Sequence, residues 1–422
     1  MCAAAAGPHG RHLYHRRTWR QFFRVMGPGI VSGASDNDPA GIVTYIQIGA
    51  TTGFGLLWLM ALSTIMMYYL EEMSTRLGVV AKQGIARILR THYGPAVALI
   101  VVVPLLVSNV ISIGADLAGT GAALELVTGL AWEWWVLPIS LALGVMLVYA
   151  SYRMVSRFLL LITPLFFLYV IEGFIVHPNW AAVVRDTLLP PIRFTPRYFA
   201  AALGLLGATL TPYIFFWQTT EEVEGRRTVK DLDAEAADVA VGMAYSNLIC
   251  YFIILVAGVV LLGHQAGIRS AAEAAASLRP IAGPAAGTIF AVAIVVSGIM
   301  SIPVMAACSA YALAEAFGWV EGLDKKVWQA RGFYVVLGGA LAVGAAIALF
   351  RIPPVTLMFW SQVLNGWLLV PLFIVLLLLS SDRRICRGHV NGTASLVVGW
   401  GTTLLTLALA LLSLGQLATQ AH

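Results

Sequence analysis

Runs of about 20 apolar residues recur along almost the whole chain, and they constrain its fold more than any other feature. Of the 422 residues, 59% are hydrophobic and only 11% are charged, with a mean hydropathy of +0.83. A water-soluble protein of this size could not cover its surface with so few polar residues. Because hydrocarbon about 30 Å thick is crossed by roughly 20 apolar residues in a helix, the sequence predicts an all-α integral membrane protein.

The apolar runs are separated by charged or Gly/Pro-rich breaks and predict eleven membrane spans. We place these spans at residues 28–50, 55–78, 97–128, 134–150, 158–177, 199–220, 236–263, 286–316, 333–350, 355–380 and 394–415. An Arg-rich segment precedes the first span, as in a signal peptide. The span lacks the short apolar core and small-residue cleavage site of such a peptide, so we expect that it is not cleaved off.

Basic residues are distributed unevenly between the predicted loops. With the N-terminus inside, most of the 26 Lys and Arg residues fall on the same side of the membrane. The positive-inside rule therefore predicts a multi-pass protein of the plasma (inner) membrane with a cytoplasmic N-terminus and an external C-terminus. The pI of about 9.1 follows from those loops and indicates attraction to anionic lipid, not to nucleic acid, because no soluble domain is left to present a groove.

The residues that would support catalysis are sparse. The four Cys and eight His are scattered, without a C-x-x-C or H-E-x-x-H pattern, and no nucleophile is paired with a base. We expect neither an enzyme nor a bound cofactor. The expected partners are the lipid bilayer and a small substrate, without an obligatory protein partner.

Two acidic residues lie in the middle of the first predicted span, in the stretch "GPGIVSGASDNDPAGIVTYIQIGA". An ionised side chain near the hydrocarbon centre costs a few kcal/mol even on mild insertion scales, so Asp36 and Asp38 are expected to have a function. Pro39 removes a backbone donor and favours an interruption of the helix at this point. A carboxylate beside freed backbone carbonyls would form a hard oxygen site for a cation, with Asp38 as the first candidate ligand. Asp36 is left with three alternatives: a ligand, a charge in a water-filled vestibule, or the partner of a basic residue.

The sixth predicted span has a matching interruption, "LGLLGATLTPYIFF", with Thr211 and Pro212 after several glycines. Kinks at Pro and Gly are common in membrane helices, so this break alone would be weak evidence. However, spans one to five and six to ten form two sets that each begin with an interrupted helix, as expected of a secondary transporter built from inverted repeats with its site at the midplane. The predicted units are 1–22, a cytoplasmic N-terminal segment; 23–195 and 196–380, the two five-helix repeats; and 381–422, a loop and the eleventh helix.

Several motifs resemble the Nramp family of divalent metal transporters, and the likeness covers nearly all the chain. They are "GPG" at Gly27, "DPAG" at Asp38, "IQIGA" at Ile46, "ADLAGTG" around Asp116, "GATLTP" in the sixth span and "SQV" at Ser361. The resemblance implies the eleven-helix form of the LeuT-type fold and, for typical members, proton-coupled uptake of manganese or iron.

The family resemblance also implies a metal site, from which this chain departs at several positions. Asp38 and the backbone carbonyl of Ala208 match the family pattern. The family's Asn is Gly41 here, its Met is Thr211 and its His is Tyr213. Gln362 matches a polar family position near the metal, with an interhelical hydrogen bond as the equal alternative.

These departures favour a harder ion. A thioether selects softer ions, whereas the hydroxyl of Thr211 is a hard, neutral ligand, and Gly41 in place of Asn leaves room for an ion that keeps part of its water. The site is thus closer to that of the Nramp-related magnesium transporter branch, with Mg²⁺ as the predicted substrate and Mn²⁺ also accepted.

Proton coupling is expected to be lost. Tyr213 does not titrate near neutral pH, and two acids typical of the family are Asn109 and Gly119, although Asp116 remains. Uncoupled import by alternating access is the predicted function. The alternatives are a proton-coupled Mn²⁺/Fe²⁺ importer that uses Asp36 and Asp116, and, less favoured, an organic-cation or amino-acid symporter in which Asp38 meets an ammonium group.

Overall fold

The computed structural model describes residues 37–149, 167–262, 268–350 and 352–420, and this part of the chain is helical without strands. Among the described helices, seven are long and apolar enough to cross a membrane. The all-α membrane architecture predicted from hydropathy is therefore confirmed.

Where the predicted spans are described, the long helices follow them closely; residues 28–36 of the first span lie outside the described part. They are α3 (Pro39–Thr52), α4 (Leu57–Ala81), α6 (Pro95–Thr128), α7 (Glu133–Tyr149), α11 (Pro196–Thr209), α12 (Pro212–Glu224), α13 (Leu232–Val260), α16 (Ala286–Phe317), α17 (Arg331–Ala348), α18 (Pro354–Ser381) and α20 (Thr393–Gln420). The end of the fifth predicted span is α9 (Phe167–Ile175), and the earlier residues of that span lie outside the described part.

Shorter helices connect these elements. They are α5 (Ile85–Tyr93), α10 (Trp180–Leu188), α14 (Ala271–Ala275), α15 (Arg279–Ala282) and α19 (Arg383–Cys386), with 3-10 turns at Val229–Asp231, Ala276–Leu278 and Gly283–Ala285.

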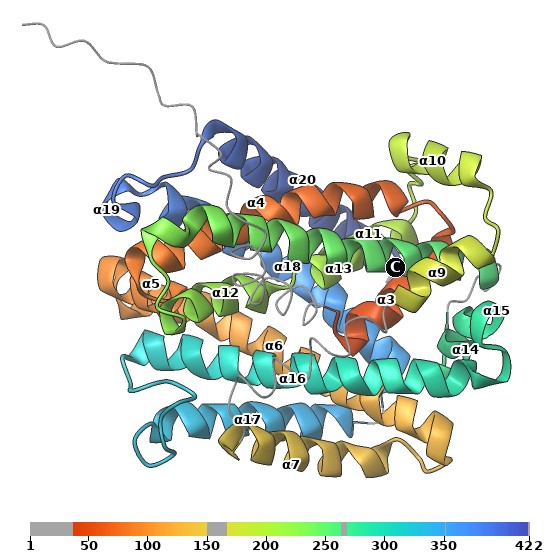
Figure 1. Ribbon diagram of the computed structural model, residues 1–422, viewed down its shortest axis with the longest axis horizontal. Coiled ribbons are helices and arrows are strands. Elements are labelled where there is room, and N and C mark those ends of the chain that lie inside the picture. Colours follow the sequence, from red (N-terminus) through yellow and green to blue (C-terminus); the bar gives the residue numbers. More distant parts are fainter. Residues whose placement is uncertain (1–36, 150–166, 263–267, 351, 421–422) are drawn as a thin grey trace, which may run out of the picture.

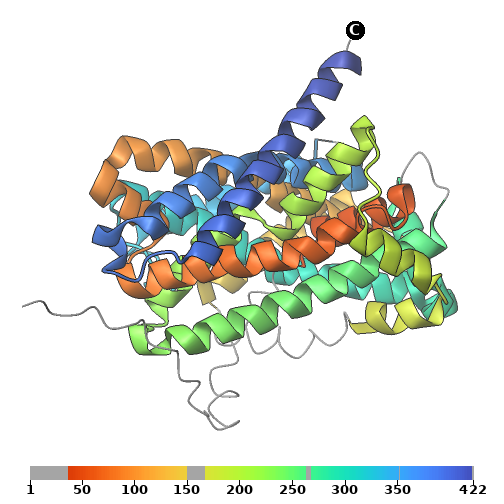
Figure 2. The same ribbon diagram turned by 90° about the horizontal axis from the view of Figure 1, so that it is seen from above.

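The helices run roughly along the same direction and form a bundle with α3 and α18 in its interior (Figure 1). Helix α16 packs along α6, and α17 and α7 lie together at one edge of the bundle. Helix α20 lies on the outside against α18, α11 and α4, and its C-terminal end projects away from the bundle (Figure 2).

Glycines allow α11 and α18 to approach until their backbones touch. A Cβ at Gly207 would collide with the backbone carbonyl oxygen of Gln362, and a Cβ at Gly366 would lie 2.5 Å from the carbonyl oxygen of Leu203. Close contact through small residues is typical of helix packing in membranes, where no hydrophobic force draws helices together. This contact fixes the backbone of Gln362 beside the end of α11.

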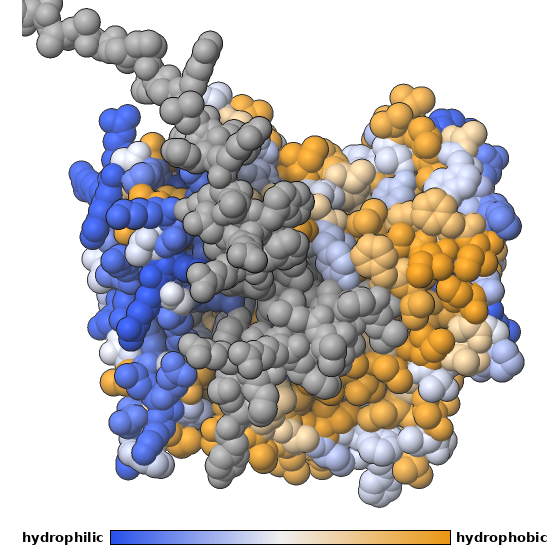
Figure 3. Space-filling view, in the orientation of Figure 1, coloured by the Kyte–Doolittle hydropathy of each residue, from blue (hydrophilic) through white to orange (hydrophobic). Residues whose placement is uncertain are grey.

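Polar residues gather at one end of the bundle, where α5 and α19 lie, while the adjoining surface is largely apolar (Figures 1 and 3). Arg87 on α5 forms an ion pair of 2.6 Å with Glu321, in the connection between α16 and α17. Burial raises the pKa of Glu321 above its ordinary value, and Arg87 opposes that rise. This polar end carries α5 and α19, whose loops the sequence assigns to the cytoplasmic side, and that assignment stays a prediction.

Candidate metal site

Helix α3 begins inside the protein, at Asp38. This residue has an extended backbone (φ −71°, ψ 159°), is the N-cap of the helix, and is fully buried. Its Oδ1 accepts a hydrogen bond of 2.5 Å from the backbone N–H of Gly41, and Pro39 occupies the first helical position, where no N–H is needed. The positive end of the helix dipole therefore faces a buried carboxylate. Asp36 lies outside the described residues, so its three alternatives remain predictions.

The predicted interruption of the sixth span is confirmed between α11 and α12. Helix α11 ends at Thr209, Thr211 has a non-helical backbone (φ −49°, ψ 131°), and Pro212 begins α12. Because Pro212 has no N–H, the carbonyl of Ala208, four residues earlier, cannot accept the usual helical hydrogen bond. Ala208 and Thr211 are both fully buried, so this break places the carbonyl of Ala208, without that helical partner, in the interior.

Helix α3 and helix α11, which precedes the break, lie against each other. The hydroxyls of Tyr45 on α3 and Thr209 on α11 are 3.2 Å apart, within hydrogen-bond distance. Two turns separate Tyr45 from the start of α3, and Thr209 immediately precedes the break. The structure thus brings α3 and the break after α11 into one interior region.

Gln362 on α18 binds the carboxylate of Asp38 directly. Its side-chain Nε2 donates to Oδ2 at 3.0 Å and to Oδ1 at 3.2 Å, and both residues are fully buried. This is the interhelical hydrogen bond that the sequence left as one of two possibilities for Gln362. Its role as a metal ligand stays a prediction.

A second carboxylate, Asp116 on α6, also caps α3. Its Oδ1 accepts from the backbone N–H of Ala40 at 3.0 Å, and its Oδ2 accepts from the hydroxyl of Ser301 on α16 at 2.8 Å. Ser301 lies near the middle of α16, which places the start of α3 about halfway along that helix. The sequence suggested Asp116 only as part of a proton route. Its position in a membrane helix, where a buried acid needs hydrogen-bond partners, could also have predicted this structural role.

Asn37, which directly precedes the acid, is held from two other helices. Its backbone carbonyl accepts from Ser297 on α16, its amide donates to Ser246 on α13 at 3.1 Å, and its Oδ1 accepts from the thiol of Cys250 at 3.0 Å. The sequence did not reveal this arrangement, because the four residues are single polar residues in three distant segments.

Two glycines at departures from the family pattern are closely surrounded. A Cβ at Gly41 would lie 2.6 Å from Oδ1 of Asp38, so the space expected beside Gly41 is taken by the carboxylate of Asp38 itself. At Gly119, a Cβ would collide with Sδ of Met358 on α18. An acidic side chain at position 119 would therefore need Met358 to move.

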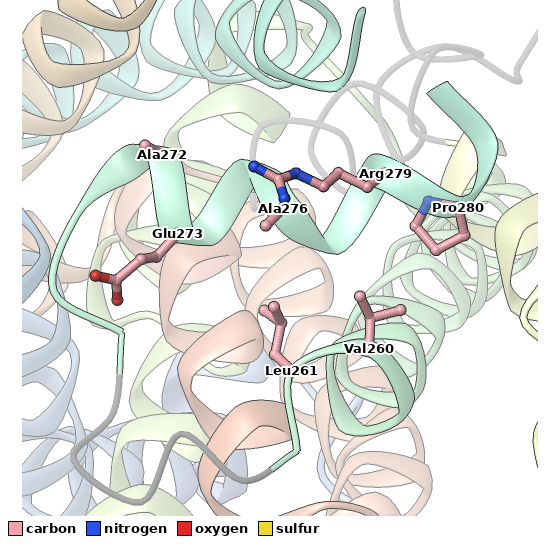
Figure 4. A pocket seen from close by; sticks show the side chains of 7 residues that line it. All are labelled: Val260, Leu261, Ala272, Glu273, Ala276, Arg279 and Pro280. Carbon is pink, nitrogen blue, oxygen red and sulfur yellow. The ribbon is translucent and has the colours of Figure 1, made fainter. Parts of the chain in front are cut away.

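Within the described ranges, no group of three or more His, Cys, Asp or Glu side chains is arranged to hold a metal ion. A site here must combine the carboxylate of Asp38 with neutral oxygens, as in oxygen-rich sites for hard cations. The pocket shown in Figure 4, about 640 Å³ in volume, is elsewhere, between the end of α13 and the segment from α14 to α15. It is lined by Val260, Leu261, Ala272, Glu273, Ala276, Arg279 and Pro280.

Comparison with solved structures identifies the fold. The manganese transporter of Eremococcus coleocola, in complex with an aromatic bis-isothiourea substituted compound, superposes with a TM-score of 0.74 at 18% identity, over 98% of this chain and 89% of that one. The H236A mutant of the same transporter gives 0.74 at 19% identity, over 98% and 89%. Mhp1, a nucleobase-cation-symport-1 family transporter in a closed conformation, gives 0.54 at 13% identity, over 93% and 92%. These matches confirm the LeuT-type fold.

The family is shown by the sequence as a whole. A model of the family described as natural resistance-associated macrophage protein-like matches residues 29–416. This range includes the interrupted first span, the break after Thr209 and the Gln362 segment. The chain therefore belongs to the Nramp family of divalent metal transporters, as its motifs indicated.

Proposed function

We propose that this protein moves Mg²⁺, and also Mn²⁺, into the cytoplasm by alternating access without coupling to protons. The observation that carries the proposal is the buried carboxylate of Asp38 at the start of α3, in a region that it shares with the carbonyl end of α11. The proposed ion ligands and neighbours are Asp38, the carbonyl of Ala208, Thr211, Gly41, Gln362 and, outside the described residues, Asp36.

The donor set favours a hard ion. Ala208 and Thr211 offer a carbonyl and a hydroxyl, and Gln362 offers an amide, so each expected donor is an oxygen. A thioether at position 211 would favour manganese and softer ions instead. The name of the Eremococcus coleocola protein, a manganese transporter, is consistent with acceptance of Mn²⁺ by this architecture.

The surroundings of the altered positions support uncoupled transport. The space beside Gly119 is occupied by Met358, and the amide of Asn109 donates to Ser309 at 3.0 Å, so both positions carry packing or neutral hydrogen bonds in place of acids. The membrane potential alone can drive import, because a divalent ion gains about 4.6 kcal/mol in crossing 100 mV, inside negative.

Proton-coupled import of Mn²⁺ or Fe²⁺ is the second candidate, and Asp116 is the observation that favours it. This acid is fully buried and caps the same helix start as Asp38. Protonation of either carboxylate would therefore change the electrostatic environment of the other. An organic-cation or amino-acid symporter is less favoured, because such substrates need an apolar or aromatic cage, whereas Asp38 is held by an amide and a backbone N–H.

The remaining parts of the proposal concern topology and organisation. The polar end of the bundle that carries α5 and α19 is assigned to the cytoplasm of the plasma (inner) membrane, with the N-terminus inside and the C-terminus outside. The repeats span 23–195 and 196–380, with residues 1–22 before them and 381–422 after them. The protein acts on the metal ion within the lipid bilayer without an obligatory protein partner.

Uptake into liposomes tests the proposal. Purified full-length protein is reconstituted, a negative internal potential is imposed, and internal dyes follow Mg²⁺ or Mn²⁺ together with internal pH. We expect uptake of both ions without acidification, and no uptake by Asp38→Ala. Acidification in proportion to metal entry would replace the uncoupled model by the second candidate, and full uptake by Asp38→Ala would remove Asp38 from the site.

A further inference from the structure

A line of hydrogen bonds runs from Asp38 through α18 to α6. Gln362 donates through Nε2 to Asp38, and its Oε1 accepts from Nδ2 of Asn365 at 2.9 Å. Asn365 also donates to the hydroxyl of Ser112 at 3.3 Å, and its Oδ1 accepts from the hydroxyl of Ser108. All five side chains are at most 2% exposed, so none of them faces bulk solvent.

The direction of every bond in this line is set by its first member. An ionised carboxylate can only accept, so Asp38 requires the NH₂ group of Gln362 to face it. The carbonyl oxygen of Gln362 then faces Asn365, which must present its own NH₂ group. The amide oxygen of Asn365 is thereby left for the hydroxyl of Ser108.

A cation bound at Asp38 reverses the first requirement. It repels the NH₂ group of Gln362 and attracts the amide oxygen, which is reached by a half-turn of the terminal amide. Nε2 of Gln362 would then face Nδ2 of Asn365, and two buried donors opposite each other are unfavourable. If Asn365 turns as well, its oxygen accepts from Gln362 and its NH₂ group faces Ser108.

The two serines can end such a reversal without loss of a hydrogen bond. A hydroxyl is both donor and acceptor, so Ser108 can change from donating to accepting and Ser112 from accepting to donating. The two residues are four positions apart on α6 and therefore present both hydroxyls on one face of the helix. No proton leaves any group in this exchange.

We propose that Asn365 is a positioning residue whose side-chain amide reverses together with that of Gln362, so that Gln362 presents nitrogen to Asp38 before a divalent cation binds and oxygen to the cation afterwards. The inference rests on the proposed function, in which Asp38 holds the transported ion. It deepens that function by assigning a role to Asn365, Ser108 and Ser112.

The first test is a double-mutant cycle on Mn²⁺ binding, measured by calorimetry with the full chain in lipid nanodiscs. Asn365→Leu leaves Nε2 of Gln362 without an acceptor in the ion-bound arrangement, and a buried N–H without a partner is tolerated less well than a carbonyl. We expect the Kd for Mn²⁺ to rise about 10-fold. In a Gln362→Leu background the same substitution should leave the Kd unchanged, because Asn365 acts only through Gln362.

Ser361→Ala is the matched control, since this buried serine is on the same helix and its hydroxyl donates to the backbone carbonyl of Met358, outside the line. It should bind Mn²⁺ as the unmodified protein does. Equal effects of Asn365→Leu with and without Gln362 would overturn the assignment. Thermal unfolding of each variant reports any loss of fold separately.

The second test observes the amide groups of the unmodified protein directly and uses variants only to assign the bands. Infrared difference spectra of the unmodified protein with and without Mn²⁺ should show shifts of two side-chain amide carbonyl bands, assigned by their loss in Gln362→Leu and Asn365→Leu. A shift of the Gln362 band alone would refute the coupled reversal. If Asp38→Asn binds Mn²⁺ normally, the proposed function itself fails. If Asp38→Asn loses binding but neither test shows coupling, only the role of Asn365 is wrong.

Discussion

The charge of Asp38 is the property on which the proposed ion site most depends, and Asp38→Asn removes it with little change of shape. Asn is also a good N-cap, so its Oδ1 can still accept from the N–H of Gly41 and helix α3 should keep its start. The amide of Gln362 can turn its oxygen toward the new NH₂ group. We therefore expect a folded protein with a nearly unchanged melting temperature.

The effect on binding follows from the loss of one buried carboxylate. Unit charges 4 Å apart attract by about 4 kcal/mol at an effective dielectric constant near 20, so a divalent ion and a carboxylate attract by about 8 kcal/mol. If desolvation offsets about half of this, about 4 kcal/mol remains, which corresponds to a rise in Kd of about 1000-fold.

Binding of Mn²⁺ by calorimetry and uptake of Mg²⁺ into liposomes measure this loss. Asp116→Asn is the matched control: it also removes a fully buried carboxylate at the start of α3, but one whose two oxygens accept from Ala40 and Ser301. We expect a much smaller rise in Kd for this control. A Kd for Asp38→Asn within about threefold of the unmodified protein, which is less than 1 kcal/mol, would refute the electrostatic reasoning.

Three further substitutions test individual contacts. Thr211→Met should shift the ratio of Mg²⁺ to Mn²⁺ uptake toward Mn²⁺, because a thioether replaces a hard oxygen. Thr211→Ser keeps the hydroxyl and should keep the ratio. An unchanged ratio in the Met variant would exclude Thr211 as a ligand. Gly41→Asn should lower Mg²⁺ uptake at least about 10-fold. The new Cβ would lie 2.6 Å from Oδ1 of Asp38 and displace the carboxylate from the helix start. Uptake at the unmodified rate would show that this close approach is unimportant. Gly207→Val should destabilise the protein by about 1–3 kcal/mol, because the valine side chain would collide with the backbone of Gln362. The loss would be measured as a lower melting temperature. An unchanged melting temperature would contradict the close packing of α11 and α18.

The polar end of the bundle gives the topology a structural basis. The basic residues that predicted the orientation are spread over distant loops in the sequence, yet α5 and α19 lie at the same end of the molecule (Figures 1 and 3). Counting Lys and Arg residues in the loops assigns each loop to a side of the membrane only if the number of membrane spans between the loops is correct. That α5 and α19 share one end is expected if an even number of spans separates them, and the orientation of the termini stays a prediction.

The sequence by itself determined the membrane environment, the positions of the described helices, the start of α3 beside Asp38 and the break after Thr209. These depend on local properties: the length of an apolar run, the missing N–H of Pro39 and Pro212, and the cost of an acid such as Asp38 in hydrocarbon. Family motifs added the expected fold and the identity of the altered positions. Gln362 could be predicted as a site residue because it belongs to one of those family motifs.

Only the tertiary structure decided which groups meet the carboxylate of Asp38. The amide of Gln362 is 324 residues away in the chain, and Asn365, Ser108 and Ser112 reach it through a line of side chains from two helices. Such contacts depend on helix rotation and on how closely two backbones approach, and neither is encoded in the pattern of a single segment. Hydrogen bonds between distant helices are short-ranged and directional, so a shift of 1 Å that no hydropathy pattern would register makes or breaks them.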